Sequence, residues 1–569
     1  MSARASLGTH VHSSLTSTPL PMLRPATCAL LLAVAATSAA PLAAQRPDTR
    51  PAPERRQRPV PAPTPAPTPT LVVFLTVDQL TPDYFERFGA QLTGGLGRLR
   101  RGGAYFPNGQ YDHATTETAP GHASVMSGRF PRSTGIVRNN AGIQDPQAPL
   151  LGTTGVAASP FRFRGTVLFD WMRTRDPRSR ALSVSRKDRG AILPLGRAHQ
   201  DVYWYAGTNG TFTTSTYYRD TLPGWVRAFN DRRLPHETAG RVWAPLLPAS
   251  AYAEPDSVPV ESGGKDFTFP HALPTDTAEA VRLVADSPWM DEITLAFALD
   301  GMQRLQLGTG PQPDLLAVSL SSTDAVGHRY GPDSKEIHDQ VLRLDRFLGA
   351  FLDSLYTLRD SARVVVALTA DHGVAPYPEL HFAGRAVPGG GRADVMPVLS
   401  RYTASLARRG VDSTAFDWDY GLLTVDRLAF QRAGVDADST LDAFARDLGR
   451  VPGVARVDRV RALAADTLRP GERGAVARRW AHALPPDLPV ELVVTLVPYY
   501  YYAGVTYATH GSPHPYDARV PIILYGAPFR AGSYPQFTRV VDIAPTLAEV
   551  VRVRPTEKLD GRVLRAALK

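Results

Sequence analysis

The chain contains a single cysteine, Cys28, among its 569 residues. This cysteine opens a short apolar run, residues 28–36, which follows Arg24 and leads into small residues up to Ala44. Such a run between arginines and small residues is typical of a secretory signal peptide, so we expect residues 1–44 to be removed. The mature protein then holds no cysteine, which excludes disulfides, thiolate metal sites and a cysteine nucleophile.

Long hydrophobic runs are also missing. No later stretch reaches about 18 consecutive apolar residues, so we expect no membrane-spanning helix. Residues 45–70 are instead dominated by Pro, Ala, Thr and Arg and end in PVPAPTPAPTPT. That composition predicts a semi-rigid, polyproline-like linker. A signal peptide and a linker ahead of the main body predict a periplasmic or secreted protein.

Clustered positive charge is absent from the body of the chain. The formal net charge is +9, of which Arg4 and Arg24 carry +2 and the linker +3, so the body carries +4. No basic helix with interleaved aromatic residues stands out. The sequence therefore does not predict nucleic acid as a specific partner.

The body does contain several buried-strand patterns. Residues 71–77, 315–320 and 363–369 are near-continuous apolar runs rich in β-branched residues. Such runs are typical of strands covered on both faces of a parallel sheet. Residues 335–355 place apolar side chains at helical spacing and predict an amphipathic crossover helix. We therefore expect an α/β fold with a central, mostly parallel sheet flanked by helices.

Each of these three strand patterns is followed by an aspartate, and two of them by a histidine as well. Asp78 follows the first strand, Asp324 and His328 follow the second, and Asp371 and His372 follow the third. Functional sites in open α/β sheets lie at the carboxyl ends of the strands. A single aspartate there is commonly a helix cap or a turn residue, but the repeated arrangement favours a dinuclear carboxylate and imidazole metal site.

A third imidazole is expected from the loop Thr509–Asp517. It holds two candidates, His510 and His514. We prefer His510 as the metal ligand, and the alternative for His514 is a hydrogen bond within the loop.

Residues 112–140 hold the candidate nucleophile. Thr118 is expected at the N-cap of a short helix in which Pro120 follows it closely. A hydroxyl at a helix N-terminus lies where free backbone N–H groups favour an anion such as phosphate. The alternative is an ordinary threonine-capped helix. Thr115 and Thr116 are the other hydroxyls nearby, but neither directly precedes the Ala-Pro-Gly-His helix start.

A pair of cations follows the predicted strand 181–185. Lys187 and Arg189 lie two residues apart, so on an extended segment they would point to the same side. Together they could clamp a doubly charged phosphate, with arginine bidentate and lysine acting as a point charge. As an isolated pattern the pair is weak, because most such pairs are simply solvated.

Composition also predicts how the body is divided. We expect a core over residues 71–398 with an insertion at about 199–288, then a small α+β cap over 399–490, and the rest of the core over 491–569. Within the insertion, the aromatic-rich stretch 201–218 could be a substrate-facing flap or a plain surface hairpin.

Taken together, these motifs resemble the alkaline phosphatase superfamily, and more closely its type I phosphodiesterase/nucleotide pyrophosphatase branch. The pair Lys187 and Arg189 and the segment WYAGTNGTFTTSTYY are similar to the PafA-type alkaline phosphatases. The resemblance extends from Leu71 to the C-terminus. It depends on the order of the motifs at Asp78, Thr118, Asn139, Asp324, His328, Asp371, His372 and His510.

The resemblance implies two Zn²⁺ ions and a phosphothreonine intermediate on Thr118. One ion would be held by Asp324, His328 and His510, and the other by Asp78, Asp371, His372 and the Thr118 oxygen. Asn139 would bind a phosphoryl oxygen together with Lys187 and Arg189, and Asn140 is the alternative at that position. We therefore expect a phosphate monoester hydrolase that acts as a monomer on small phosphate esters.

Two other functions remain open at this point. A phosphodiesterase or nucleotide pyrophosphatase would use the same metals and nucleophile, and an inactive secreted binding protein could keep the fold. A sulfatase is excluded, because it needs a formylglycine made within C/S-x-P-x-R, which Thr118-Ala119-Pro120-Gly121-His122 does not provide.

Overall fold

The structure, a computed structural model, describes residues 67–140 and 142–569. The predicted signal peptide and nearly all of the predicted linker lie outside the described residues. All of these described residues belong to one compact unit. None of the helices in the described part of the chain is both long and apolar enough to cross a membrane.

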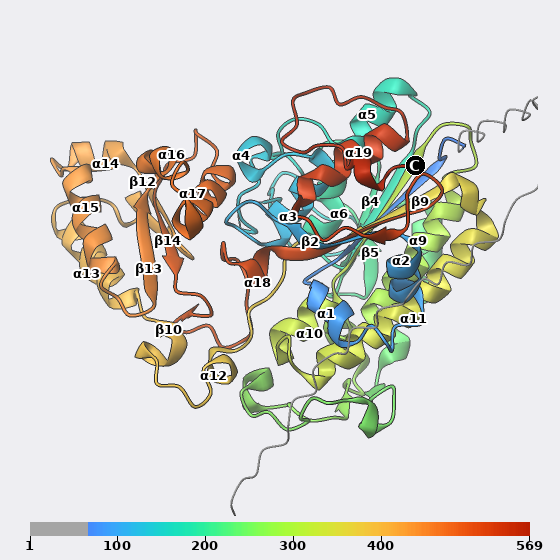
Figure 1. The fold of residues 1–569 in the computed structure, drawn as a ribbon, viewed down its shortest axis with the longest axis horizontal. Helices are drawn as coiled ribbons and strands as arrows, with labels where there is room; N and C mark the ends of the chain where they lie inside the picture. Colours follow the sequence, from blue (N-terminus) through green and yellow to red (C-terminus); the bar gives the residue numbers. More distant parts are fainter. Residues whose placement is uncertain (1–66, 141) are drawn as a thin grey trace, which may run out of the picture. The chain divides into compact units, whose positions relative to one another are not determined.

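A ten-stranded sheet forms the centre of this unit (Figure 1). Its strand order is β17-β2-β16-β9-β1-β8-β3-β4-β5, with β18 beside β2. The central strands β9, β1, β8, β3 and β4 run parallel, whereas β16, β2 and β5 pair in antiparallel fashion with their neighbours β9, β16 and β4. The strands are β1 (Leu71–Val77), β2 (Ala104–Gln110), β3 (Ala181–Ser185), β4 (Asp201–Ala206), β5 (Thr211–Thr213), β8 (Asp314–Leu320), β9 (Val364–Thr369), β16 (Arg519–Tyr525), β17 (Gly532–Ser533) and β18 (Thr538–Arg539).

The predicted α/β fold with a mostly parallel sheet is confirmed. Strand β1 lies between β8 and β9 and is buried on both faces, with every side chain at most 1% exposed. This burial explains its unbroken apolar sequence, since both faces of a parallel sheet are covered by helices. In Figure 1, helices lie on both faces of the sheet. One group comprises α3 (Thr118–Ser127), α5 (Leu168–Arg175), α6 (Asp188–Ile192) and α19 (Ile543–Val550), and the other α2 (Gly95–Gly102), α9 (Trp289–Arg304) and α11 (Lys335–Leu358).

A second, four-stranded antiparallel sheet has the order β11-β12-β14-β13. We call this sheet and its helices the cap, drawn in orange in Figure 1. Its strands are β11 (Phe416–Asp419), β12 (Leu422–Val425), β13 (Val454–Arg459) and β14 (Val490–Leu496), and its main helices are α13 (Met396–Arg408), α15 (Ala437–Leu448) and α17 (Gly471–Ala483). Leu423 and Leu492 pack in one apolar cluster with residues of α15, and Leu422 and Val493 in another with residues of α17.

Two predicted boundaries are wrong. Strand β14 pairs with β12 and β13, so the run that begins near Glu491 belongs to the cap sheet and not to the resumed core. Asp201–Thr213, at the start of the predicted insertion, instead provides β4 and the edge strand β5 of the main sheet. An apolar run reveals a buried strand, but the partner strands decide which sheet it joins. The remaining division into core and cap domains stays a prediction.

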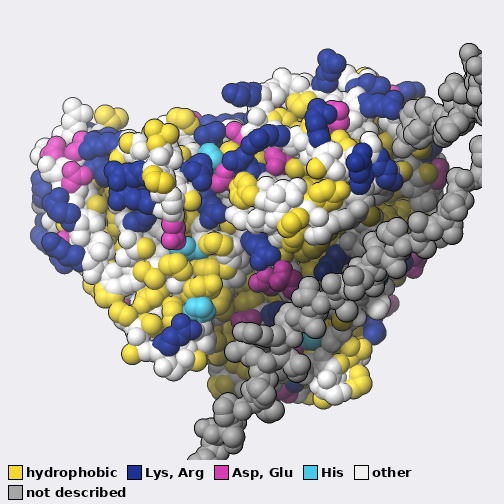
Figure 2. Space-filling model, viewed as in Figure 1, with side chains coloured by type: hydrophobic (Ala, Val, Ile, Leu, Met, Phe, Trp, Pro, Cys, Tyr) yellow, Lys and Arg dark blue, Asp and Glu magenta, His cyan; other side chains and the backbone are white. Residues whose placement is uncertain are grey.

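Figure 2 shows many Lys and Arg side chains over the cap. Several are paired with carboxylates, as at Arg459, which lies 2.5 Å from both Asp438 and Asp442. These ion pairs neutralise part of the positive charge on this surface.

Candidate metal centre and active site

The predicted site residues first meet at the carboxyl end of β1. Asp78 directly follows this strand and is fully buried. Its Oδ2 lies 2.5 Å from Lys187 Nζ, and its Oδ1 lies 3.3 Å from His372 Nε2. Burial and the neighbouring carboxylates of Asp324 and Asp371 raise the pKa of Asp78 to about 6. Carboxylates this close together repel one another when ionised, and positive charge beside them would stabilise their ionised forms.

Asp371 and His372 follow β9, the neighbouring strand. His372 Nε2 lies 3.6 Å from Asp371 Oδ2, while its Nδ1 lies 3.0 Å from the carbonyl oxygen of Gly373. Because a carbonyl only accepts, this contact places the proton on Nδ1 and leaves Nε2 free to coordinate a metal. A Cβ atom at Gly121 would lie 2.3 Å from the Asp371 carbonyl oxygen. Glycine is therefore required for α3 to approach this loop.

Thr118 lies beside these residues, but not at the helix position we predicted. Helix α3 begins at Thr118, and the N-cap is Glu117. The Thr118 hydroxyl oxygen is 3.5 Å from His372 Nε2 and 3.4 Å from Lys187 Nζ. Its side chain thus points at the acidic and imidazole groups rather than capping the helix. Thr116, one of the alternatives, donates its hydroxyl to the Ser512 carbonyl oxygen instead.

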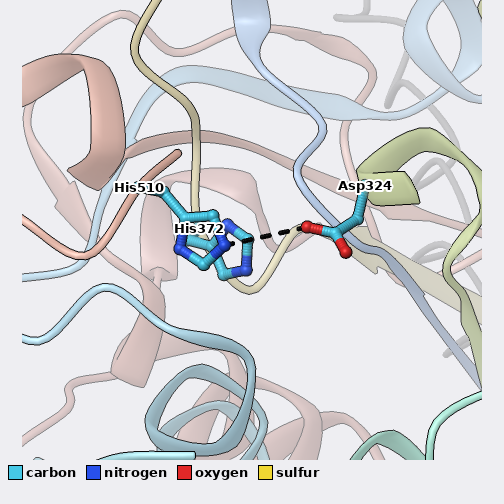
Figure 3. Close-up of side chains that lie close together, drawn as sticks. All are labelled: Asp324, His372 and His510. Carbon is cyan, nitrogen blue, oxygen red and sulfur yellow. Dashed lines mark ion pairs between the residues drawn. The ribbon is translucent and has the colours of Figure 1, made fainter. Parts of the chain in front are cut away.

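Helix α10 (Ser322–Tyr330) presents Asp324 and His328 one turn apart. His328 Nε2 lies 3.2 Å from both Asp324 Oδ1 and His510 Nε2, and His510 Nε2 lies 3.8 Å from Asp324 Oδ1. The rings of His372 and His510 stack with centroids 3.5 Å apart. Figure 3 shows the two overlapping imidazoles and the Asp324 carboxylate facing them. The three residues predicted for one ion are therefore close together.

Backbone carbonyl oxygens orient the imidazole rings of His328 and His510. His328 Nδ1 donates to Ala508 O at 2.5 Å, and His510 Nδ1 donates to Thr116 O at 2.8 Å. In both rings this leaves Nε2 as the available ligand atom. Burial, with His372 and His328 close by, holds the pKa of His510 well below its ordinary value, so its ring is neutral at pH 7. His514, the competing candidate, instead points Nε2 at the Leu496 carbonyl oxygen at 2.8 Å.

The donor set fits divalent cations. Atoms of Asp78, Asp371 and His372 lie within 4.8 Å of one another, and so do atoms of Asp324, His372 and His510. Among the described residues, the buried Asp371 Oδ2 accepts no hydrogen bond. The ammonium of Lys187 contacts both Asp78 and Asp324, the latter at 2.6 Å. Carboxylate oxygens and neutral imidazoles are the ligands that Zn²⁺ and similar ions prefer.

The predicted cation pair lies at the start of a short helix. Lys187 is the N-cap of α6, and Arg189 lies inside that helix, so the expected extended segment is wrong. Lys187 reaches Asp78, Asp324 and Thr118, whereas the ion pair described for Arg189 is with Asp188 at 3.5 Å.

Asn139 lies at the N-terminus of α3, next to Thr118. Its Oδ1 accepts the Ala119 N–H at 2.8 Å, and its own backbone N–H donates to Glu117 at 2.9 Å. Asn140, the alternative, is exposed. With Oδ1 engaged, the Asn139 side chain retains its NH₂ group as a donor for an anion.

Two further residues of the site escaped the sequence analysis. Gln79 is fully buried; its backbone N–H donates to Asp371 Oδ1 at 3.1 Å and its Nε2 to Asp324 Oδ1 at 2.9 Å. It therefore holds a carboxylate from each predicted ligand group. His122 lies 3.3 Å from Asp371 Oδ2. In the sequence, only their positions could have indicated a role: Gln79 follows Asp78, and His122 lies one helical turn after Thr118.

We expect Gln79→Met to weaken metal binding about 10- to 100-fold, as is common when a residue that orients a ligand is lost. Methionine keeps the length of the side chain but cannot donate to Asp324, and the backbone N–H to Asp371 remains. Zinc titration of the apoprotein measures the effect, with the unfolding temperature as a control for folding. Unchanged zinc affinity in a folded variant would contradict this role.

A family model described as type I phosphodiesterase/nucleotide pyrophosphatase matches residues 72–388. Alkaline phosphatase PhoV of Synechococcus elongatus is 30% identical over 519 residues, covering 88% of this chain and 93% of PhoV. Alkaline phosphatase PhoK of a Sphingomonas species is 32% identical over 521 residues, covering 87% of this chain and 90% of PhoK. The crystal structure of alkaline phosphatase PafA aligns with a TM-score of 0.80 and 27% identity, covering 88% of this chain and 99% of PafA.

These similarities support the expectation of a phosphatase enzyme and imply metal dependence. They agree with the arrangement of the acidic and imidazole groups around Thr118. The chain belongs to the type I phosphodiesterase/nucleotide pyrophosphatase family of the alkaline phosphatase superfamily, in which it is PafA-like.

Proposed function

We propose that the protein is an exported alkaline phosphatase that hydrolyses small phosphate monoesters as a monomer, with Thr118 as its nucleophile. One observation carries this proposal. The Thr118 hydroxyl lies 3.5 Å from His372 Nε2, an atom of the imidazole that belongs to both candidate ligand groups. The export proposal, to the periplasm or the medium, depends on the sequence pattern of residues 1–44.

We propose two Zn²⁺ ions as the cofactors. Asp324, His328 and His510 would hold one ion, and Asp78, Asp371, His372 and the Thr118 oxygen would hold the other. When bound, such ions lower the pKa of a coordinated hydroxyl and stabilise negative charge on the leaving oxygen.

Thr118 would act in two displacements. Its Oγ gives up its proton and forms a bond to phosphorus while the bond from phosphorus to the leaving oxygen breaks. The leaving oxygen takes up a proton, so the step gives a phosphothreonine and releases the alcohol. A water molecule then attacks phosphorus from the opposite side, and the bond to Thr118 Oγ breaks to release phosphate. The free hydroxyl of Thr118 is restored, so each cycle consumes one ester and one water.

Charge on the non-bridging phosphoryl oxygens would be stabilised by Asn139, Lys187 and Arg189. Lys187 Nζ already lies 3.4 Å from the Thr118 hydroxyl oxygen. Asn139 is held beside Thr118 by its bond from the Ala119 N–H, with its NH₂ group available. A monoester carries more negative charge than a diester, so these donors favour monoesters.

The second candidate is a phosphodiesterase, because the matching family is described by that activity. Comparing kcat/KM for an aryl phosphate monoester and the corresponding aryl diester at alkaline pH separates the two. We expect the monoester to be hydrolysed faster. Faster hydrolysis of the diester would replace the monoesterase proposal, and hydrolysis of neither would favour an inactive binding protein.

Replacing both Lys187 and Arg189 with alanine should lower kcat/KM for the monoester by about 10²–10³-fold, the range seen when a charge-stabilising donor is lost. The diester should lose far less, because it brings less charge to the site. The single variants should show that Lys187 contributes more, since Arg189 is engaged with Asp188.

Arg186→Ala is a matched control, because this neighbouring cation pairs with Asp286 at 2.8 Å. We expect it to leave the monoester-to-diester ratio unchanged. Equal losses on both esters in the double variant would argue against a monoester clamp.

A further inference from the structure

A pocket of about 300 Å³ adjoins the candidate active site. Its wall includes His328, His510 and Asn139, so it opens next to the groups around Thr118. Its volume is at the lower end of the roughly 300–1,000 Å³ typical of small-molecule sites. Much of the remaining wall is aromatic. It comes from the cap, from the segment after β14 that includes β15 (Tyr501–Tyr502), and from α18 (Pro515–Ala518): Tyr420, Trp480, Tyr500, Tyr501, Tyr502 and Tyr516.

Tyr420 occupies an unfavourable position at the mouth of this pocket. It lies with Gly421 in the two-residue turn between β11 and β12, where Asp419 pairs with Leu422. The φ angles of Tyr420 and Gly421 are 38° and 91°, as in a type I′ turn, which strongly prefers asparagine at the first of these positions. Yet this position carries a tyrosine that is 60% exposed. A strained backbone under a large exposed ring indicates a role other than stability.

Arg138 connects this turn to the helix that carries Thr118. Its Nε lies 2.7 Å from Glu117, the N-cap of α3, and its guanidinium donates to the Tyr420 carbonyl oxygen at 3.1 Å. The guanidinium carbon lies 5.9 Å from the centre of the Tyr420 ring. The ring of Tyr502 lies 6.2 Å away, tilted by 69°. The turn is therefore held in place over the pocket.

Charge in the pocket argues against an anionic leaving group. Among the described residues that line it, Arg138 is the only lysine or arginine. Its guanidinium is already paired with Glu117 and lies 3.7 Å from Asp419. No free cation in this lining remains for a second phosphate, whereas aromatic faces suit a planar, uncharged ring.

We propose that this pocket binds a planar, uncharged aromatic ring carried by the leaving group of the phosphate ester, and that Tyr420 selects for that ring. The inference rests on the proposed phosphatase function and narrows its substrates to ring-bearing monoesters. The ring can belong to a nucleoside or to a phenyl-bearing alcohol, since both offer the same face for stacking.

Two matched pairs of substrates test the proposal without changing the leaving-group chemistry. Adenosine 5′-monophosphate is compared with ribose 5-phosphate, and 2-phenylethyl phosphate with ethyl phosphate; each pair differs mainly by the ring. We expect kcat/KM to be at least about fivefold higher for the ring-bearing member, as stacking on an aromatic side chain provides. A preference in the first pair alone identifies a nucleobase, in the second alone a phenyl ring, and in both a general ring site.

The variant Tyr420→Asn distinguishes a role of Tyr420 in binding the ring from a role in stabilising the turn. Asparagine suits the type I′ turn, so we expect a higher unfolding temperature together with loss of the ring preference. Tyr420→Phe should keep the preference. Phe537→Ala is the control, because Phe537 is another exposed ring beside an arginine, Arg539, and is not among the residues lining the pocket.

Three results would overturn the inference. They are equal kcat/KM within both pairs for the unaltered enzyme, an unchanged ring preference in Tyr420→Asn, and an equal loss on all four esters in that variant. Hydrolysis of the ringless esters without any ring preference would refute the pocket but keep the phosphatase. Hydrolysis of none of the four esters would refute both.

Discussion

Thr118→Ala is expected to lower kcat for an aryl phosphate monoester by at least about 10³-fold, the scale seen when a nucleophile is removed. The change deletes the hydroxyl oxygen that lies 3.5 Å from His372 Nε2 and 3.4 Å from Lys187 Nζ. Alanine cannot form the bond to phosphorus, so no covalent intermediate can accumulate. Steady-state rates and mass spectrometry of acid-quenched enzyme measure both consequences.

The variant should remain folded. Thr118 does not cap its helix, and the Ala119 N–H is held by Asn139 rather than by the lost hydroxyl. We expect the free energy of unfolding to change by about 1 kcal/mol or less, as for a typical point substitution. Thr118→Ser is the matched control, since it retains a hydroxyl and should keep measurable activity. A Thr118→Ala enzyme that still turned over at the normal rate would remove this residue from the reaction.

Removing the metal should abolish activity as completely as Thr118→Ala does. The carboxylates of Asp78, Asp324 and Asp371 lie within one buried site, and Lys187 contacts two of them. Dialysis against a chelator should therefore stop hydrolysis, and added Zn²⁺ should restore it. Metal analysis of the restored enzyme should give two ions per chain. Activity that persists after complete chelation would refute the metal mechanism.

Stability gives a second measure of metal binding. An ion that binds only the folded state stabilises it by about 4 kcal/mol when its free concentration is 1,000 times its Kd. The chelated protein should therefore unfold at a lower temperature than the zinc-loaded protein. The shift should be smaller in Asp324→Asn, because one of the buried carboxylates is lost. Equal unfolding temperatures with and without zinc would contradict a metal site in the folded protein.

Much of the central fold could be predicted because its cause is local. Strands β1, β8 and β9 are near-continuous apolar runs, which are typical of a parallel sheet covered on both faces. Asp78, Asp324 and Asp371 could be selected because the carboxyl ends of such strands meet at one edge. His510 was preferred over His514 from the same loop, and the structure brings it to His328, from which it is separated by 182 positions in the sequence.

Other features depend on partners that are distant in the sequence. Strand β14 has the same apolar pattern whichever sheet it joins, and pairing with β12 and β13 places it in the cap. Gln79 became significant only once the folded chain brought Asp324 and Asp371 to its two donor groups. The short helix that contains Arg189 was not revealed by the pattern of charges.

The sequence by itself determined the α/β class, the ends of the central strands and the residue types available for chemistry, because these follow from local hydrophobicity and from the chain direction within a parallel sheet. Only the tertiary structure decided which carboxylates and imidazoles share a neighbour, that Lys187 reaches Thr118, and that Tyr420 stands over a pocket beside the site. Those distances come from packing between segments that are distant in the sequence, which no local pattern encodes.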